Sequence, residues 1–198
     1  MNLDFDQAIV LENERVRLAP LADIHIELLT EVGAKDHDLM KYSPSAVHTP
    51  ELMNSYVRSA LTERKQLTKY PFAIFDKQLG KYAGSTSYGN ISNKDQRLEI
   101  GWTWIGKEFQ RTGLNRNCKF LLLQFAFETL HFERVEFKTD SRNLQSRKAI
   151  EQIGGIFEGE FRSHSVMSDG FRRNTVYYSI LKNEWPELRN SVFKSFSN

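Results

Sequence analysis

The sequence contains only one cysteine, Cys118, in 198 residues. A single cysteine cannot form a disulfide within the chain, and this usage is typical of a reducing compartment. No apolar run approaches the roughly 18 residues expected of a membrane-spanning helix. The first ten residues, MNLDFDQAIV, are acidic where a secretory signal peptide would be basic. We therefore expect a cytoplasmic protein with no membrane partner.

An excess of charge of either sign is also missing. Lys and Arg number 27 against 25 Asp and Glu, so the formal net charge is +2. This balance, without a basic stripe, disfavours a nucleic-acid partner. The five histidines lack the spacing of a metal motif, and neither a GxxxxGK(S/T) nor a GxGxxG loop occurs. We expect no metal site, and the sequence disfavours an NTPase or a dinucleotide enzyme.

Strands and helices alternate along the chain with no linker or repeat between them, so we expect residues 1–198 to form one domain. Alternating apolar residues predict strands at 9–19, 70–76, 81–90, 96–105, 134–140, 156–166 and 171–182. Apolar residues at helical spacing predict helices at 21–32, 50–69, 117–130 and 141–153. The order β-α-α-β-β-β-α-β-α-β-β predicts an α/β fold in which the strands within 70–105 form an antiparallel meander.

The helix predicted at 117–130 is apolar on two stripes rather than one. The first stripe is Leu114, Cys118, Leu121, Leu122 and Phe125, and the second is Phe120, Leu123, Phe127 and Leu130. A helix with so much apolar surface packs on a sheet and is also covered by other elements. We expect this helix to be central.

The stretch EFQRTGLNR, residues 108–116, joins a predicted strand to this helix. A helix N-terminus leaves its first N–H groups unpaired and carries about half a positive charge, so a pyrophosphate can bind the backbone of residues 111–115. Gly113 would permit close approach, with Arg111 and Arg116 on either side. The alternative is that Thr112 is an N-cap and Gly113 a turn residue.

Three local sequences at the joints of this order resemble the GNAT superfamily of acyl-CoA-dependent N-acyltransferases. QRTGLN, residues 110–115, fits the Q/R-x-x-G-x-G/A loop, NLQS, residues 143–146, fits N-x-x-S, and GGIFEG, residues 154–159, is similar to G-F-x-x-E-G. The closest resemblance is to the branch that includes the ribosomal-protein N-terminal acetyltransferases. Asn115 departs from the family's small residue, and Gly155 stands where Phe is usual.

The resemblance implies a strongly twisted mixed sheet of six to seven strands with about four helices, and acetyl-CoA as cosubstrate. It implies that Asn143 bonds the pantetheine arm and that Ser146 lies near the thiol. Asn143 also has a simpler interpretation as an N-cap with Ser146 at the third helical position. The residues that the resemblance assigns to CoA are Trp104, Ile105, Gln110, Arg111, Thr112, Gly113, Leu114, Asn115, Asn143, Ser146 and Lys148.

Transfer of an acyl group to an amine needs a base for the amine and an acid for the departing thiolate. Glu99, on the strand that is expected to splay for the cofactor, is the candidate base, acting directly or through water. Ser146 and Tyr178, or its neighbour Tyr177, are candidates for protonating the thiolate. A strand carboxylate facing solvent and core tyrosines are the simpler interpretations of these residues.

The acceptor is expected to be a primary amine, either a peptide or protein N-terminus or a small amine. The aromatic and basic groups expected at the acceptor wall are Tyr42, Tyr56, Tyr88, His164 and Arg172. This mixture suits a polar peptide better than a polycation. Homodimer formation and a donor other than acetyl-CoA are left open. The alternative function is a non-catalytic acyl-CoA-binding regulatory module.

Overall fold

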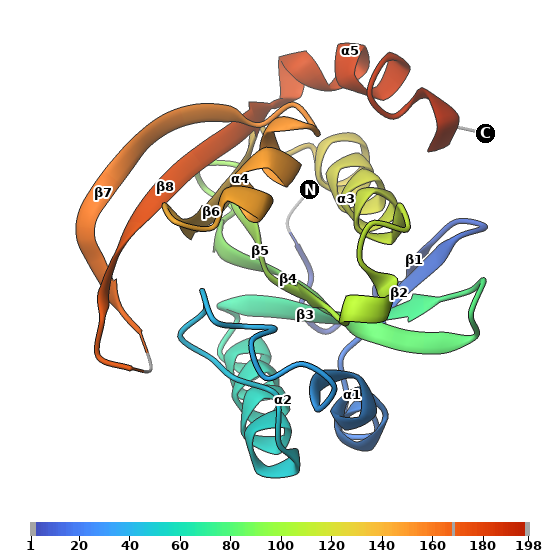
Figure 1. The fold of residues 1–198 in the computed structure, drawn as a ribbon. Helices are drawn as coiled ribbons and strands as arrows, with labels where there is room; N and C mark the ends of the chain where they lie inside the picture. Colours follow the sequence, from blue (N-terminus) through green and yellow to red (C-terminus); the bar gives the residue numbers. More distant parts are fainter. Residues whose placement is uncertain (1–2, 168, 197–198) are drawn as a thin grey trace.

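The computed structural model describes residues 3–167 and 169–196, which form one eight-stranded sheet with helices on both faces (Figure 1). The strands are β1 Leu11–Glu12, β2 Val16–Pro20, β3 Lys69–Asp76, β4 Lys81–Ser92, β5 Arg97–Ile105, β6 Arg134–Asp140, β7 Ile156–Val166 and β8 Arg172–Leu181. The helices are α1 His25–Gly33, α2 Pro50–Lys65, α3 Leu114–Gln124, α4 Leu144–Glu151 and α5 Trp185–Asn190. No helix among the described residues is both long and apolar enough to cross a bilayer.

The strands lie in the order β1-β2-β3-β4-β5-β6-β8-β7, and only β5 and β6 pair in parallel. The α/β class and the antiparallel meander of β3, β4 and β5 are confirmed. The predicted strand 9–19 is divided into β1 and β2, because Asn13 Oδ1 accepts hydrogen bonds from the backbone N–H groups of Arg15 and Val16 at 2.9 and 3.0 Å. The sheet therefore has eight strands rather than six to seven, and α5 is an additional helix.

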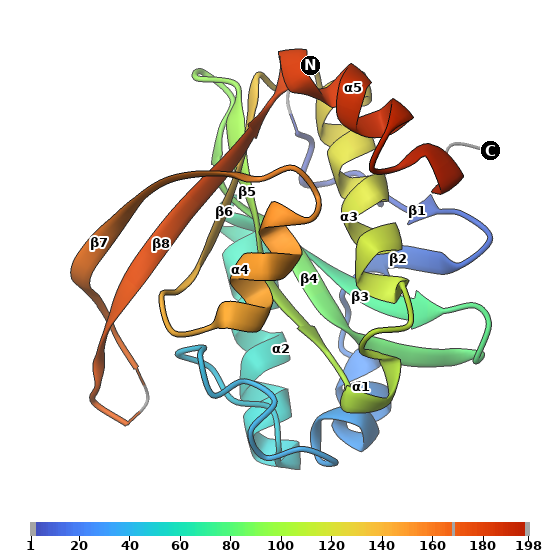
Figure 2. The same ribbon diagram turned by 45° about the horizontal axis from the view of Figure 1, so that its top comes forward.

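Helices α1 and α2 cover one face of the sheet, and α3 and α4 cover the other (Figures 1 and 2). Helix α3 is central, as its two apolar stripes predict. One stripe packs on the sheet, where Leu114 and Cys118 are fully buried. On another side Phe120 contacts the rings of Trp185 in α5 and of Phe193 at centroid distances of 6.1 and 5.6 Å.

Strands β5 and β6 pair over only three residues and then diverge (Figure 2). The last pair is Glu99 with Glu136, after which β5 continues to Ile105 and β6 to Asp140 without pairing to each other. The predicted separation of β5 from β6 is therefore present. Glu99 lies where the two strands stop pairing.

A bulge in β5 lies beside this opening. Ser85 of β4 pairs with Trp104 and Ser87 pairs with Gly101, so Trp102 and Thr103 together oppose one residue of β4. Trp102 has a φ of 51°, which is unusual for a residue with a side chain. Bulges turn side chains to new directions and are common beside active sites. Here the Trp102 ring lies 4.4 Å from Lys69 Nζ of β3, and the Trp104 ring lies 6.1 Å from that of Tyr56 in α2. The Thr103 hydroxyl contacts Lys119 of α3.

Candidate active site

The turn before α3 has the backbone geometry of an anion site. Gly113 has a φ of 86° and Arg111 a φ of 61°. Among the described residues, no acceptor is recorded for the backbone N–H groups of Arg111, Thr112, Gly113, Asn115 and Arg116. A side chain added at Gly113 would meet no atom within 4 Å, so the space beside this backbone is open. Free N–H groups at the start of a helix attract phosphate.

The cap interpretation of this turn is confirmed in part and is compatible with an anion site. Gly113, rather than Thr112, is the N-cap of α3. Thr112 Oγ1 accepts from the backbone N–H of Leu114 at 3.4 Å and donates to the carbonyl of Phe109 at 2.7 Å. Gln110 Nε2 donates to the carbonyl of Ile105 at 2.9 Å, which ties the turn to the end of β5.

The expectation that Arg116 flanks the anion site is wrong. Its guanidinium donates to the carbonyl of Val192 at 2.5 Å and lies over the rings of Phe193 and Phe196. These contacts turn Arg116 toward the C-terminal segment. Arg111 is exposed and remains available to a phosphate.

The start of α4 lies across the opening from α3. Asn143 Oδ1 accepts from the backbone N–H of Ser146 at 3.0 Å, which confirms the predicted N-cap. Ser146 is half-buried, and Lys148, two residues further along the helix, is exposed. On the opposite side of the opening, Trp104 and Ile105 at the end of β5 are buried, at 4% and 7% exposure.

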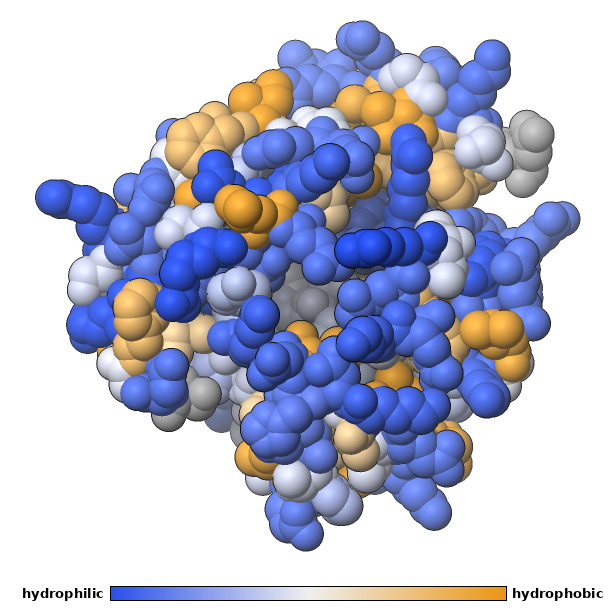
Figure 3. All heavy atoms as spheres, viewed as in Figure 1, coloured by the Kyte–Doolittle hydropathy of each residue, from blue (hydrophilic) through white to orange (hydrophobic). Residues whose placement is uncertain are grey.

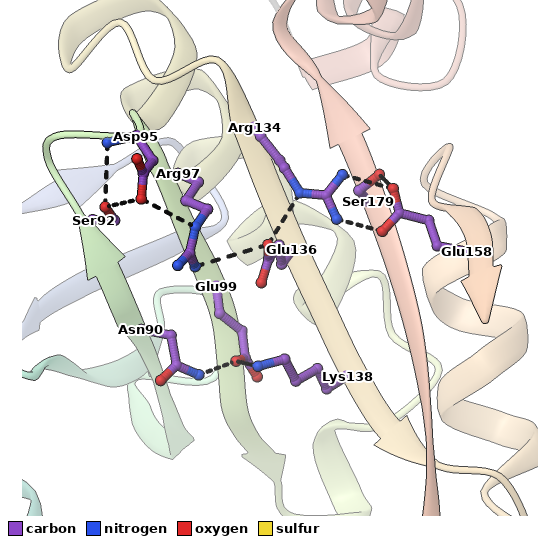
Figure 4. A network of polar contacts seen from close by, with 10 residues as sticks. All are labelled: Asn90, Ser92, Asp95, Arg97, Glu99, Arg134, Glu136, Lys138, Glu158 and Ser179. Carbon is purple, nitrogen blue, oxygen red and sulfur yellow. Dashed lines mark hydrogen bonds and ion pairs between the residues drawn. The ribbon is translucent and has the colours of Figure 1, made fainter. Parts of the chain in front are cut away.

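Glu99 is 5% exposed and bound by two side chains from neighbouring strands. Its Oε2 lies 2.9 Å from Lys138 Nζ of β6 and 2.6 Å from Asn90 Nδ2 of β4 (Figure 4). Burial lowers the pKa of Lys138, but the Glu99 carboxylate raises it, so that the pKa lies above the ordinary lysine value. The candidate base is therefore a carboxylate held in an ion pair.

Tyr178 is fully buried and is bound by two residues of α4. Arg147 Nε donates to its hydroxyl at 3.1 Å, and the hydroxyl donates to Glu151 Oε1 at 3.0 Å. Burial raises the pKa of Tyr178, with Arg147 lowering it and Glu151 raising it. The hydroxyl proton of Tyr178 is thus already engaged in a hydrogen bond to Glu151.

The catalytic candidates lie on opposite faces of the sheet. Tyr178 contacts α4, whereas Lys138 lies 4.8 Å from the ring of Tyr177, the next residue of β8. Successive side chains of a strand point to opposite faces, so Lys138 and its partner Glu99 face α1 and α2. The surface is hollowed between α3, α4 and the α1–α2 connection, and hydrophilic residues border this hollow (Figure 3).

The expectation that Tyr88 lines an acceptor wall is wrong. Tyr88 is fully buried and donates to the carbonyl of Leu122 in α3 at 2.6 Å, and burial raises its pKa well above the ordinary value. Tyr56, in α2, is also buried, at 8% exposure, with its ring 6.1 Å from that of Trp104, so it too belongs to the core rather than to an acceptor surface. Tyr42, in the α1–α2 connection, accepts through its carbonyl from Arg173 of β8 at 2.9 Å.

Sequence reasoning missed Asn90, Lys138 and Lys119. Asn90 and Lys138 meet Glu99 only through strand pairing, and no local pattern marks them. Lys119 had a visible signal, because it interrupts the apolar run of a helix predicted to be buried. It is 7% exposed, and its Nζ donates to Thr103 Oγ1 at 2.8 Å.

Comparison with known proteins identifies relatives of this chain. The candidate ribosomal N-acetyltransferase YdaF of Bacillus subtilis (strain 168) is 36% identical over 106 residues, which are 54% of this chain. The matched segment spans 57% of YdaF, less than two thirds of that relative. The crystal structure of a GCN5-related N-acetyltransferase from Brucella melitensis superposes with a TM-score of 0.86 and 28% identity, covering 96% of this chain and 86% of that one.

A ribosomal-protein-S5-alanine acetyltransferase from Vibrio fischeri shares the fold, with a TM-score of 0.71 at 19% identity over 89% of this chain and 98% of that one. The model of the acetyltransferase (GNAT) domain matches residues 15–156, which is more than half of the sequence. The chain therefore belongs to the GNAT family of acetyltransferases.

Proposed function

We propose that the protein transfers an acetyl group from acetyl-CoA to a primary amine by direct attack in a ternary complex. One observation carries the proposal: the unpaired N–H groups before α3 lead to an opening between β5 and β6 that ends at Glu99. We further propose that residues 1–198 act as one cytoplasmic domain. A single buried cluster that includes residues from Leu3 to Phe193 supports this.

In this proposal the pyrophosphate binds backbone N–H groups of residues 111–115, with Gln110 holding the turn. Leu114 contributes its N–H by exchanging its long bond to Thr112 Oγ1 for one to a phosphate oxygen. The pantetheine arm passes along Trp104 and Ile105 of β5 toward the closed end of the opening. Asn143 and Ser146 face the arm from α4, and Lys148 reaches the phosphorylated nucleoside. The N-terminus of α3 favours the negative charge of the phosphates.

The amine attacks the thioester carbonyl from the face of α1 and α2, where Glu99 lies. Glu99 accepts a proton from the amine, directly or through water, as the carbon–nitrogen bond forms and the carbon–sulfur bond breaks. The thiolate leaves on the opposite face and takes a proton from Ser146 or Tyr178. Tyr178 already donates to Glu151, so the geometry favours Ser146 for this step.

We propose a peptide or protein N-terminus, or a small amine, as the acceptor. The likeness to YdaF, whose name refers to ribosomal N-acetylation, supports a protein substrate. So do the polar and aromatic side chains of Tyr42, His164 and Arg172, which lie at least partly at the surface. An α-amino group has a pKa of about 8, and a large neutral fraction of it is available without a strong base.

The ion pair of Glu99 with Lys138 favours a second candidate, a module that binds acyl-CoA without catalysis, because the pair occupies the carboxylate. A thiol-reactive dye can follow CoA release from acetyl-CoA with a panel of N-terminal peptides, amino acids, polyamines and amino sugars. The proposed enzyme releases thiol with at least one of these amines, and peptides react faster than spermidine. Tight acetyl-CoA binding with no thiol release above the hydrolysis blank would establish the non-catalytic module instead.

A further inference from the structure

Lys119 is a buried lysine without a carboxylate partner. It lies on α3 with 7% exposure, and no Asp or Glu oxygen among the described residues lies within 4.0 Å of its Nζ. Lys119 Nζ donates a hydrogen bond to Thr103 Oγ1, which is itself 2.7 Å from Thr86 Oγ1. An ammonium has three N–H donors, so this buried group has donors to spare.

Asn115 lies one helical turn before Lys119, on the same side of α3. Its Oδ1 is buried and has no hydrogen-bond partner within the part of the chain that the structure describes. Residues four apart on a helix are neighbours, so an unused acceptor and an underused donor stand side by side. Buried polar atoms without partners are rare in folded proteins and call for an explanation.

We call residues 111–115, where the pyrophosphate is proposed to bind, the phosphate turn. Both side chains border the path from this turn into the opening between β5 and β6. Asn115 belongs to the turn with the free N–H groups, and Lys119 contacts Thr103 in the bulge of β5. Thr103 lies on the part of β5 that does not pair with β6. A ligand arm entering from the turn therefore passes Asn115 first and Lys119 second.

We propose that Asn115 and Lys119 together bind an amide group of the pantetheine arm of acyl-CoA. Asn115 Oδ1 accepts from the amide N–H, and Lys119 Nζ donates to the amide carbonyl. This assignment rests on the proposed use of acetyl-CoA and adds two residues that recognise its arm. It also gives a role to the asparagine that stands where the related loop has a small residue.

The chemistry of the pair selects an amide over the other groups of the ligand. A phosphate offers acceptors only, so it can satisfy Lys119 but leaves Asn115 Oδ1 without a donor. An alkyl segment satisfies neither side chain. An amide supplies one donor and one acceptor, and it compensates the buried ammonium through its carbonyl dipole. Burial lowers the pKa of Lys119 to about 8, which is consistent with an ammonium that is short of partners in the free protein.

Calorimetric titration with two probes tests the assignment. The probes are CoA and adenosine 3′-phosphate 5′-diphosphate, which has the same nucleotide and pyrophosphate but no arm. In Lys119→Met and in Asn115→Ala, affinity for CoA is expected to fall tenfold or more, while affinity for the armless probe stays within twofold of wild type. Lys119→Gln retains a donor and should lose less than Lys119→Met. Lys94→Met, which removes an exposed lysine from the β4–β5 turn, is the charge-matched control and should bind both probes as wild type does.

The two substitutions should be non-additive, because each leaves the same amide half-bound. Equal losses for both probes would overturn the assignment, since the side chains would then act on the phosphates or on the fold. Unchanged CoA affinity in both variants would overturn it as well. If the protein does not bind acyl-CoA at all, wild-type protein will bind neither probe. If it binds acyl-CoA without catalysis, both probes will bind and the thiol-release assay will be negative, so each failure is distinguishable from failure of this assignment.

Discussion

Glu99 Oε2 and Lys138 Nζ lie 2.9 Å apart at the point where β5 and β6 stop pairing (Figure 4). Both side chains are largely buried, with 7% and 18% of their surfaces exposed. Asn90 Nδ2 donates to the same carboxylate oxygen at 2.6 Å. Lys138 and Asn90 therefore fix the orientation of the residue that we propose as the base.

Replacing Glu99 by Gln tests the proposed base. We expect kcat for the best amine of the panel to fall by about 10²- to 10⁴-fold, the usual contribution of a positioned acid or base. The loss of kcat should be larger for amines of high pKa, because a larger fraction of such an amine is protonated and must be deprotonated before it attacks. Glu136→Gln is the matched control, because Glu136 pairs with Glu99 in the ladder but binds Arg134 instead. An equal loss of kcat in both variants would contradict the role of Glu99.

The pKa of Lys138 should depend on Glu99. Burial lowers this pKa and the carboxylate raises it, so Glu99→Gln is expected to lower it. Because the folded-state pKa of Lys138 is raised, the stability that the pair contributes is present below the unfolded value of about 10.4 and is lost as pH rises through the folded value. NMR titration of the lysine side chain in both proteins checks the direction. An unchanged titration would mean that the two side chains do not interact in solution.

Gly113→Val tests the phosphate turn. Gly113 has a φ of 86°, so a β-branched residue there is strained by about 1–3 kcal/mol even though the space beside it is open. We expect more than tenfold weaker CoA binding, since 1.4 kcal/mol corresponds to a factor of ten. Gly159→Val is the control, because Gly159 also has open space but no positive φ. Intact CoA affinity in a folded Gly113→Val protein, measured by calorimetry, would show that the turn is only a helix cap.

Lys119→Met should stabilise the protein at neutral pH. Burial lowers the pKa of Lys119 from 10.5 to about 8, so the unfolded chain binds more protons between these values and wild-type stability rises with pH across that window. Below pH 8 the buried charge costs about 1–3 kcal/mol, after allowance for the lost bond to Thr103. Urea unfolding at pH 7, 8.5 and 10 should show a gain for Lys119→Met that shrinks as pH rises. A gain that is constant with pH would contradict the burial of a charged amine.

Ser146→Ala and Tyr178→Phe separate the two candidates for the acid. We expect Ser146→Ala to lower kcat tenfold or more with little change in melting temperature. Tyr178→Phe removes a hydroxyl that bridges Arg147 and Glu151, so it should cost about 1–3 kcal/mol of stability and change kcat less. Steady-state kinetics and thermal unfolding on both variants decide the assignment. The reverse pattern would make Tyr178 the acid.

Features that depend on a few adjacent residues were predictable from the sequence. The N-cap at Asn143, the turn at Gly113 and the two buried stripes of α3 are examples, because capping, positive φ and helical period are local properties. The meander of β3 to β5 was predictable for the same reason, since short turns join its strands. The turn at Asn13 was missed although it is also local, because the apolar alternation on both sides of it masked the turn residue.

The sequence by itself determined the turn at Gly113, the central helix and the order of strands and helices from β2 to β8. Only the tertiary structure decided that β5 parts from β6 after Glu99, that Lys138 neutralises this carboxylate, and that Arg116 turns away from the phosphate turn. These contacts join residues that are distant in sequence, and they depend on how the helices pack against the sheet. Their energies come from burial and from partners brought together by folding, and no local pattern records either.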